Sequence, residues 1–409
     1  DAIELARDGF PLPADIARQF AQRSERLGRF PGGRAAFQKS DGTKYVAGDL
    51  WKQPDLAKTL ERIARRGRAG FYEGDTADML VSEMRRHGGL ISHDDLKDYR
   101  SVWRDPIVGT YRDYSVVSMP PPSSGGALLI QILNMMEPFA VGAMGYGSAD
   151  VMHLMVEAER RAYADRAEHL GDPDFYRVPL QQLVDKGYAR QRFKGFDPDR
   201  AGISADVNAG AFAHESKETT HLSIMDRTGN AVALTTTLNS GYGSHIVVEG
   251  AGFLLNNEMD DFSSKPNTLN QFNLIGREAN AIEPRKRMLS SMTPTVVLRD
   301  GKPFLVTGSP GGSTIITTVL QVLVNVIDHG MTLSEAVSAP RFHHQWIPDS
   351  ITVEADSFSA GTLDALRKKG HLDIRPARYG LGDANSIMRV DGVLHGVEDP
   401  RTQGGAAGY

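Results

Sequence analysis

A pair of threonines follows a small, polar stretch near the middle of the sequence. Residues 201–218 have little apolar periodicity, which is typical of an exposed and cleavable connection. Thr219 and Thr220 then open a β-prone run. A hydroxyl in that position could attack the peptide bond before it, and the freed α-amine would serve as its general base. The plainer interpretation, two ordinary β-branched residues at the start of a strand, stays open on this evidence.

Composition excludes several other kinds of chemistry. The 409 residues include 46 Lys+Arg and 51 Asp+Glu, a formal net charge of −5, and no basic stripe, so nucleic acid is not an expected partner. The absence of cysteine excludes disulfides, thiolate metal ligands and cysteine nucleophiles. No run of about 18 apolar residues occurs, so no membrane span is expected. Because the sequence starts at Asp1 without a Met or a signal peptide, we expect an upstream part to be missing.

The elements that must position Thr219 differ between the two halves of the chain. In the first half, apolar spacings of three and four predict amphipathic helices, and a Pro- and Gly-rich rigid loop at 119–126 feeds the third of them. The predicted helices cover residues 54–65, 76–87, 126–137 and 149–169.

The second half predicts three hairpins separated by helices. The hairpins pair 222–226 with 231–238, 295–298 with 304–307, and 387–390 with 393–397. The helices cover 312–328, 332–338 and 360–369. Bunched strands with few alternating βα units favour an α+β layered fold over a Rossmann fold or a barrel.

Several segments, in order and at close to the family spacing, resemble the signature segments of γ-glutamyltranspeptidases. They are 219–223, 254–262, 289–294, 308–313 and 339–346, with further likeness at 120–126, 170–175, 399–401 and 407–409. The resemblance covers essentially the whole chain. It implies the four-layer αββα sandwich of N-terminal nucleophile hydrolases. It also implies one cut, giving residues 1–218 as the end of a large subunit and residues 219–409 as a small subunit.

The resemblance also implies roles for individual residues. Thr219 matches the nucleophile, and Thr237 matches a threonine that supports it by hydrogen bonding. Asn239, Glu258 and Asp261 match positions that hold the amino-acid head of a γ-glutamyl donor. The carboxylates of Glu258 and Asp261 suit its ammonium group, although a solvated turn stays open as the plainer interpretation of Asp260-Asp261.

Two serines and two glycines complete the implied site. Ser290 and Ser291 match serines that bind the donor carboxylate. Gly311 and Gly312 match the pair whose backbone N–H groups form an oxyanion hole, which the start of a helix at 312 suits. A phosphate loop does not fit because no Gly-Lys-Ser/Thr follows, and the chain contains no G-x-S-x-G elbow.

Metal chemistry has weak support in the sequence. His343 and His344 are adjacent and point in different directions, so a structural role is favoured, and no His-Glu-x-x-His occurs. No cofactor or metal is expected.

Two departures from the family pattern concern the donor pocket. Residues 265–280 match a lid in length, but Phe272 stands where many bacterial members have a tyrosine, which puts the closure of the pocket in doubt. The family's arginine for the donor α-carboxylate is expected upstream of Asp1, so no residue of this sequence is assigned to it.

The resemblance implies a γ-glutamyl transferase/hydrolase that acts on glutathione-like donors, with water or an amino acid or peptide as acceptor. The two subunits would stay associated after cleavage, and export to the periplasm or outside the cell is implied. Two alternatives remain: an acylase that removes a glutaryl group from a β-lactam, and an unprocessed, inactive homologue that serves as a binding or scaffold module.

Overall fold

The computed structural model describes residues 1–207, 219–263 and 277–408. They form two compact units. Unit 1 comprises Asp1–Trp103 and Ser240–Asn257, and unit 2 comprises Arg104–Asn239 and Glu258–Tyr409. All nine expected site residues belong to unit 2. The expected division at residues 218 and 219 concerns a peptide cut and not packing, and it stays a prediction.

Unit 1 is mostly helical. The segment Ser240–Asn257 is held to its helices by two apolar clusters. One cluster joins Phe20 and Phe37 to Val247, and the other joins Leu80 to Val248. The elements are α1 (Ala2–Asp8), β1 (Phe10–Pro11), α2 (Ala14–Leu27), α3 (Pro31–Phe37), β2 (Leu50–Trp51), α4 (Pro54–Arg66), α5 (Ala69–Tyr72), α6 (Asp75–His87) and α7 (His93–Asp98).

Unit 2 is built on a six-stranded antiparallel sheet with the order β13-β12-β8-β7-β4-β3. A separate hairpin, β5–β6, contacts strands β7, β8 and β12 of that sheet, and β9, β10 and β11 form a small sheet. The strands are β3 (Ile107–Tyr111), β4 (Tyr114–Ser118), β5 (Thr220–Met225), β6 (Ala231–Thr236), β7 (Thr295–Arg299), β8 (Lys302–Thr307), β9 (Phe342–His343), β10 (Ile351–Val353), β11 (Ile374–Pro376), β12 (Ser386–Val390) and β13 (Val393–Val397).

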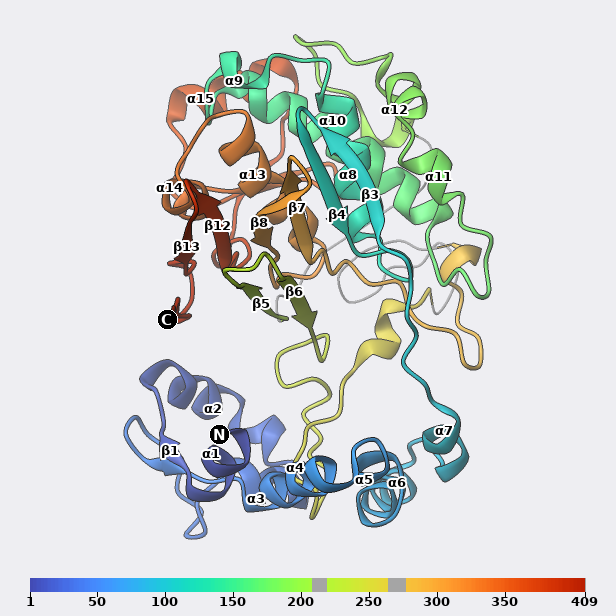
Figure 1. Ribbon diagram of the computed structural model, residues 1–409, viewed down its shortest axis with the longest axis vertical. Coiled ribbons are helices and arrows are strands. Elements are labelled where there is room, and N and C mark those ends of the chain that lie inside the picture. The colour runs from blue at the N-terminus through green and yellow to red at the C-terminus, as the bar shows by residue number, and fades with distance from the viewer. Residues whose placement is uncertain (208–218, 264–276, 409) are drawn as a thin grey trace. The chain divides into compact units, whose positions relative to one another are not determined.

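Helices of unit 2 share one apolar core with the six-stranded sheet. Helix α8 contacts β3 and β4, and both α10 and α13 contact α8 (Figure 1). The helices are α8 (Gly125–Met136), α9 (Val141–Met144), α10 (Ala149–His169), α11 (Leu180–Leu183), α12 (Lys186–Phe193), α13 (Thr314–Ile327), α14 (Leu333–Ser338) and α15 (Ala360–Lys369), with single 3-10 turns η1 (Ser204–Asp206), η2 (Glu258–Asp261) and η3 (Glu278–Asn280). The expected α+β class is confirmed.

The predicted helices and hairpins are confirmed to within a few residues at their ends. The amphipathic interpretation was wrong for α8 and α10, because both helices are buried around most of their circumference. Helix α10 buries charged residues with its apolar ones. Glu157 bonds to Arg160 and Arg161, so burial of these charges is compensated by pairing.

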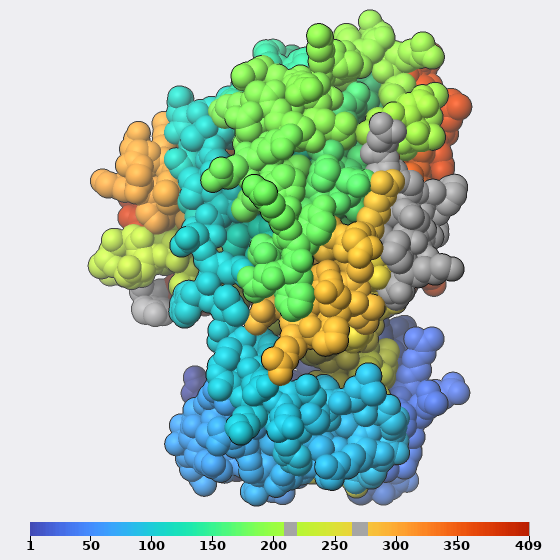
Figure 2. All heavy atoms as spheres, turned by 90° about the vertical axis from the view of Figure 1, so that its right-hand side faces the viewer, coloured from blue at the N-terminus to red at the C-terminus, as the bar shows by residue number. Residues whose placement is uncertain are grey.

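Two segments that are far apart in the sequence lie side by side after α10. Gly171 packs so closely that a Cβ atom would lie 2.0 Å from the Ala279 carbonyl oxygen. The buried Asp172 carboxylate accepts a hydrogen bond from the Arg287 N–H at 2.9 Å. Figure 2 shows the green segment after α10 directly beside the orange segment around η3. These contacts fix the stretch of chain that leads into Ser290.

The described helices are each too short or too polar to cross a bilayer. This agrees with the sequence, in which no run of about 18 apolar residues occurs.

Candidate active site

Thr219 lies across the β5–β6 hairpin from Thr237. Thr220 pairs with Thr236 in the ladder. Thr219, just before β5, therefore lies opposite Thr237, just after β6. The Thr219 hydroxyl donates to the Thr237 Oγ1 at 3.2 Å, and the Asn239 N–H donates to the same oxygen at 2.8 Å. The hairpin therefore places a hydroxyl acceptor beside the expected nucleophile.

His221, two residues after Thr219, supports the hairpin from the same face. Its ring nitrogens contact Thr235 Oγ1 at 2.9 Å and Ser223 Oγ at 3.0 Å. Gly308 leaves room for the ring, because a Cβ atom there would lie 2.2 Å from its Cε1. Burial lowers the pKa of His221 to about 4, so the imidazole is neutral at pH 7. We interpret this residue as part of the hairpin's packing.

Asn239 links the nucleophile to the acidic turn. It is buried with a φ of 77°, a left-handed conformation that Asn tolerates better than most residues. Its Nδ2 donates to Asp261 Oδ1 at 3.0 Å. The 3-10 turn η2 spaces Glu258 and Asp261 three residues apart, which puts both carboxylates on one side of the turn.

This placement disfavours the ionised forms of the two carboxylates. Burial raises the pKa of Glu258 to about 7. Burial, followed by the nearby Glu258, raises the pKa of Asp261 to about 8, against the opposing effects of Asn239 and Arg166. A cation that binds between them would therefore stabilise their ionised forms.

Ser290 is held by the Pro-rich loop before α8. The Ser290 N–H donates to the Pro122 carbonyl at 2.8 Å, and the Ser124 N–H donates back to the Ser290 carbonyl at 2.8 Å. Gly125 permits this approach, since a Cβ atom there would lie 2.3 Å from the Met292 carbonyl oxygen. The expected loop before α8 is present, and its hydrogen bonds hold the backbone of Ser290.

The glycine pair lies just before α13. The helix begins at Thr314 and not at residue 312, so Gly311 and Gly312 form the preceding turn, with φ values of 138° and 57°. Neither N–H donates to an acceptor among the described residues. The Tyr163 hydroxyl of α10 donates to the Ser313 carbonyl at 2.5 Å, which fixes the end of the turn.

One cavity of unit 2 brings most of the expected site residues together. Glu258 and Gly311 are not among its lining residues, although Glu258 affects the pKa of Asp261 and Gly311 precedes Gly312. The lining residues are Arg166, Thr219, Thr237, Asn239, Asp261, Leu289, Ser290, Ser291, Met292, Gly312, Ser313 and Ile315.

Sequence reasoning missed Arg166, which reaches the cavity from the buried helix α10. The one available signal was an arginine at the end of a helix that precedes the recognised segment 170–175. The expected lid lies outside the described residues over 264–276, including Phe272, and so does the linker over 208–218.

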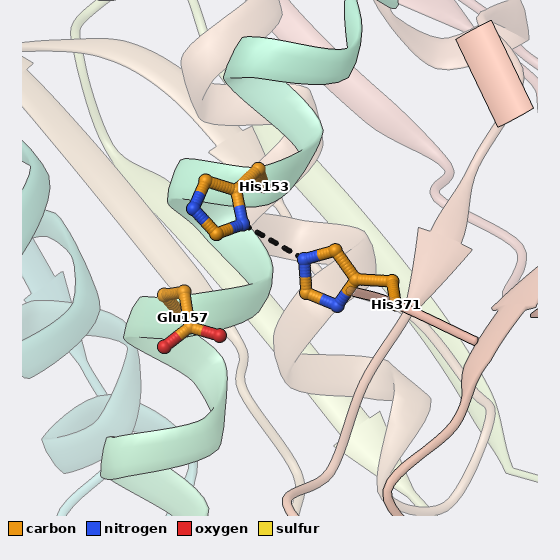
Figure 3. A group of neighbouring side chains, drawn as sticks. All are labelled: His153, Glu157 and His371. Carbon is orange, nitrogen blue, oxygen red and sulfur yellow. Dashed lines mark hydrogen bonds between the residues drawn. The ribbon is translucent and has the colours of Figure 1, made fainter. Parts of the chain in front are cut away.

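A buried group elsewhere in unit 2 contains metal-ligating residue types. His153, Glu157 and His371 lie together, and the His153 Nδ1 and His371 Nε2 atoms are 2.8 Å apart (Figure 3). His153 Nε2 contacts the Asp197 carbonyl, and the Glu157 carboxylate bonds to Arg160 and Arg161. Because the ligand atoms already have protein partners, we interpret the group as internal packing. His343 and His344 also have separate partners, Thr317 and Asp349.

Comparison with known proteins shows the family of this chain. The family model described as gamma-glutamyltranspeptidase matches residues 1–409. The chain is 50% identical over 404 residues to a glutathione hydrolase proenzyme of Escherichia coli (strain K12), covering 98% of this chain and 69% of the relative. It is 46% identical to the glutathione hydrolase proenzyme of Pseudomonas aeruginosa (strain PAO1), covering 98% of this chain and 72% of the relative.

A solved structure extends the likeness to the fold. The cephalosporin acylase from Bacillus halodurans superposes with a TM-score of 0.86 at 27% identity, over 100% of this chain and 73% of that chain. The fold and the site thus define an N-terminal nucleophile hydrolase. Within that class, the chain belongs to the γ-glutamyltranspeptidase family, and the family resemblance of the sequence is confirmed.

Proposed function

We propose that the protein cleaves the γ-glutamyl amide bond of glutathione-like donors through an ester on Thr219. The observation that carries this proposal is the Thr219–Thr237 hydroxyl contact of 3.2 Å in a cavity that also holds Asp261 and Ser291. A nucleophile thus adjoins an acidic group and a group of hydrogen-bond donors. A γ-glutamyl head carries an ammonium and a carboxylate, which need these two environments.

Maturation comes first in this proposal. The Thr219 hydroxyl adds to the carbonyl carbon of the preceding peptide bond, and the acyl group moves from nitrogen to oxygen. This shift breaks the C–N bond and frees the α-amine of Thr219. Water then hydrolyses the ester, which restores the Thr219 hydroxyl and leaves a carboxylate on the preceding residue. In the mature enzyme that amine takes the hydroxyl proton as Thr219 attacks the γ-amide carbonyl. Thr237 and Asn239 orient the hydroxyl.

The amide nitrogen leaves with a proton from the same amine, which leaves a γ-glutamyl ester on Thr219. Water, or the amine of an amino acid or peptide, then attacks that ester. The N–H groups of Gly311 and Gly312 would stabilise the oxyanion of each tetrahedral intermediate, since they precede α13 at its positive end. No step requires a cofactor.

The acidic group favours a γ-glutamyl donor over a glutaryl one. A glutaryl group lacks the α-ammonium, so binding it would leave Glu258 and Asp261 near each other without a cation. The acylase activity in the name of the Bacillus halodurans structure remains the second candidate, at lower identity than the glutathione hydrolases. A panel of γ-glutamyl and glutaryl anilides separates them, because equal turnover would contradict the role of Asp261.

The inactive-homologue alternative is tested by processing. A denaturing gel of the purified full-length protein should show two fragments, which remain together under native conditions. Thr219→Ala should give one band and no activity. A wild-type protein that stays as one band after long incubation would support the scaffold alternative. Export to the periplasm or the medium, which the family resemblance implies, is tested by fractionation of the producing cells.

A further inference from the structure

Arg166 has one face on the cavity and is almost fully buried. It lies near the end of α10 and is 4% exposed. Its Nη2 donates to Ser291 Oγ at 3.2 Å, and its Nε donates to Ser124 Oγ at 2.9 Å. A guanidinium group has donors and no acceptor, so the direction of both hydrogen bonds is fixed. Ser291 and Ser124 must therefore be the acceptors.

This direction decides where the Ser291 proton points. A serine hydroxyl has one proton and two acceptor lone pairs. Because Arg166 takes a lone pair, the Ser291 O–H is left to donate elsewhere. No described residue accepts from it, and the side chain lines the cavity. The proton is therefore available to a ligand.

A backbone N–H group fixes the direction of the Ser290 hydroxyl in the same way. The Met292 N–H donates to Ser290 Oγ at 3.1 Å, which again occupies a lone pair and leaves the proton for the cavity. Both serines thus face the cavity as donors. An ionised carboxylate is an acceptor-only group, so a pair of donors matches it and mismatches an amine or an amide N–H.

The second bond of Arg166 secures this arrangement. Ser124 accepts from Arg166 and donates its own proton to the Ser290 carbonyl at 2.8 Å. The chain of bonds runs from α10 through the loop before α8 to the serine segment. One guanidinium group therefore fixes the side chain of Ser291 and the backbone of Ser290.

We propose that Arg166 is a positioning residue that makes Ser291 a hydrogen-bond donor and so gives the site its selectivity for the donor α-carboxylate. This proposal rests on the proposed function. It differs from direct ion pairing, in which the guanidinium would itself hold the carboxylate. Its positive charge near Asp261 is an additional effect, because Arg166 lowers the pKa of that carboxyl.

The test compares three anilides as substrates of the full-length, processed enzyme. They are the γ-glutamyl anilide, the glutaryl anilide, which lacks the amine, and the 4-aminobutyryl anilide, which lacks the carboxylate. Assays at pH 9 keep Asp261, with its pKa of about 8, largely ionised. The readout is the ratio of kcat/KM for the γ-glutamyl anilide to that for the 4-aminobutyryl anilide. Because both values come from one preparation, the folded fraction cancels.

Arg166→Gln should lower this ratio by about 10- to 100-fold, mainly through KM, as expected for the loss of hydrogen bonding to a charged group. The value of kcat/KM for the glutaryl anilide should fall by as much as the value for the γ-glutamyl anilide. Arg166→Lys, which keeps the charge without the two-pronged geometry, should recover only part of the ratio. Equal losses for all three anilides would overturn the proposal.

A double-mutant cycle distinguishes positioning from direct contact. If Arg166 acts through Ser291, adding Arg166→Gln to Ser291→Ala should lower the ratio by no more than about twofold further. Independent, multiplying losses would overturn the positioning role. Arg161→Gln is the matched control, because Arg161 is a buried arginine of the same helix that bonds to Glu157, and its ratio should stay at the wild-type value. A wild-type enzyme without selectivity for the carboxylate would instead contradict the proposed function.

Discussion

The two ends of the cavity hold charge in different ways. At the acidic end, burial raises the pKa of Glu258 to about 7, and burial followed by the nearby Glu258 raises the pKa of Asp261 to about 8. At the serine end, every bond has a fixed direction, from Arg166 and from the loop before α8. The carboxylates of the acidic end thus become fully ionised when a cation binds. At the serine end, the directions of the hydrogen bonds are already fixed before a ligand binds. Under the proposed function, the ammonium and the carboxylate of one substrate head would be recognised by two different physical means within one pocket.

The largest effect should come from the expected nucleophile, which lines the same cavity. Thr219→Ala removes the nucleophile and should lower activity by roughly 10⁴-fold or more, with no processing into two fragments. Thr219→Ser keeps a hydroxyl and should retain both processing and measurable turnover. Activity of the alanine variant above one per cent of wild type would show that another group carries the chemistry.

Next in size is the loss of the proposed oxyanion site. Gly311→Ala should lower kcat about 10²- to 10³-fold with a small change in KM. The backbone at φ 138° disfavours a side chain, and the new Cβ would lie 2.4 Å from Thr314 Oγ1. Gly301→Ala is the control, since Gly301 also has a positive φ of 73° but open space around it. A kcat that falls equally in both variants would point to a general backbone effect.

The acidic end should show a smaller and substrate-dependent effect. Asp261→Asn removes a charged partner of the ammonium, so kcat/KM for the γ-glutamyl anilide should fall about 10- to 100-fold. The glutaryl anilide, without an ammonium, should be turned over as well as before or better. Steady-state kinetics on both anilides measure this, and a parallel loss on both would contradict the division of the pocket into two ends.

The pH dependence sharpens the same contrast. Because the pKa values of Glu258 and Asp261 are raised to about 7 and 8, both are partly protonated near neutral pH. Their charge, and with it the affinity for an ammonium group, is lost as pH falls through 8 and 7. We expect kcat/KM for the γ-glutamyl anilide to rise across this window more steeply than for the glutaryl anilide. The Thr219 amine affects both substrates alike, so identical profiles would contradict the raised pKa values.

The smallest effect concerns stability away from the cavity. Burial lowers the pKa of His371 to about 3 and that of His344 to about 4, and it also lowers the pKa of His153 (Figure 3). The unfolded chain takes up protons below about pH 6.5, while the folded chain does not. The free energy of unfolding should therefore fall as pH drops from about 6.5 toward 4. Denaturant titrations at several pH values measure this, and a flat profile would contradict neutral buried histidines.

Much of the fold follows from local patterns. The three predicted hairpins and the helices at 149–169 and 360–369 appear with nearly the expected bounds, because turn residues and apolar spacing act over a few neighbours. The buried charges of α10 could not be predicted in this way. Pairing between Glu157 and Arg161 looks in sequence like a solvated helix face, and only the tertiary packing shows that it is buried.

The residues of the site also divide into those that the sequence predicted and those that depend on tertiary packing. The family resemblance named Thr219, Asp261 and Ser291, and the structure brings them into one cavity. Arg166 was missed because its bonds to Ser124 and Ser291 join residues 42 and 125 positions apart, which no spacing rule connects. The start of α13 was misplaced by two residues, since the helix begins at Thr314 and Gly312, with a φ of 57°, belongs to the turn before it.

The most direct test of the account is the mass and N-terminal sequence of the smaller fragment after maturation and brief reaction with a γ-glutamyl anilide. The fragment should begin at Thr219 and contain 409 − 218 = 191 residues if the chain ends at Tyr409. Acid quenching should trap a portion of it with the added mass of one γ-glutamyl group on Thr219. A fragment that begins at another residue, or an acyl group on another side chain, would contradict the central role of Thr219.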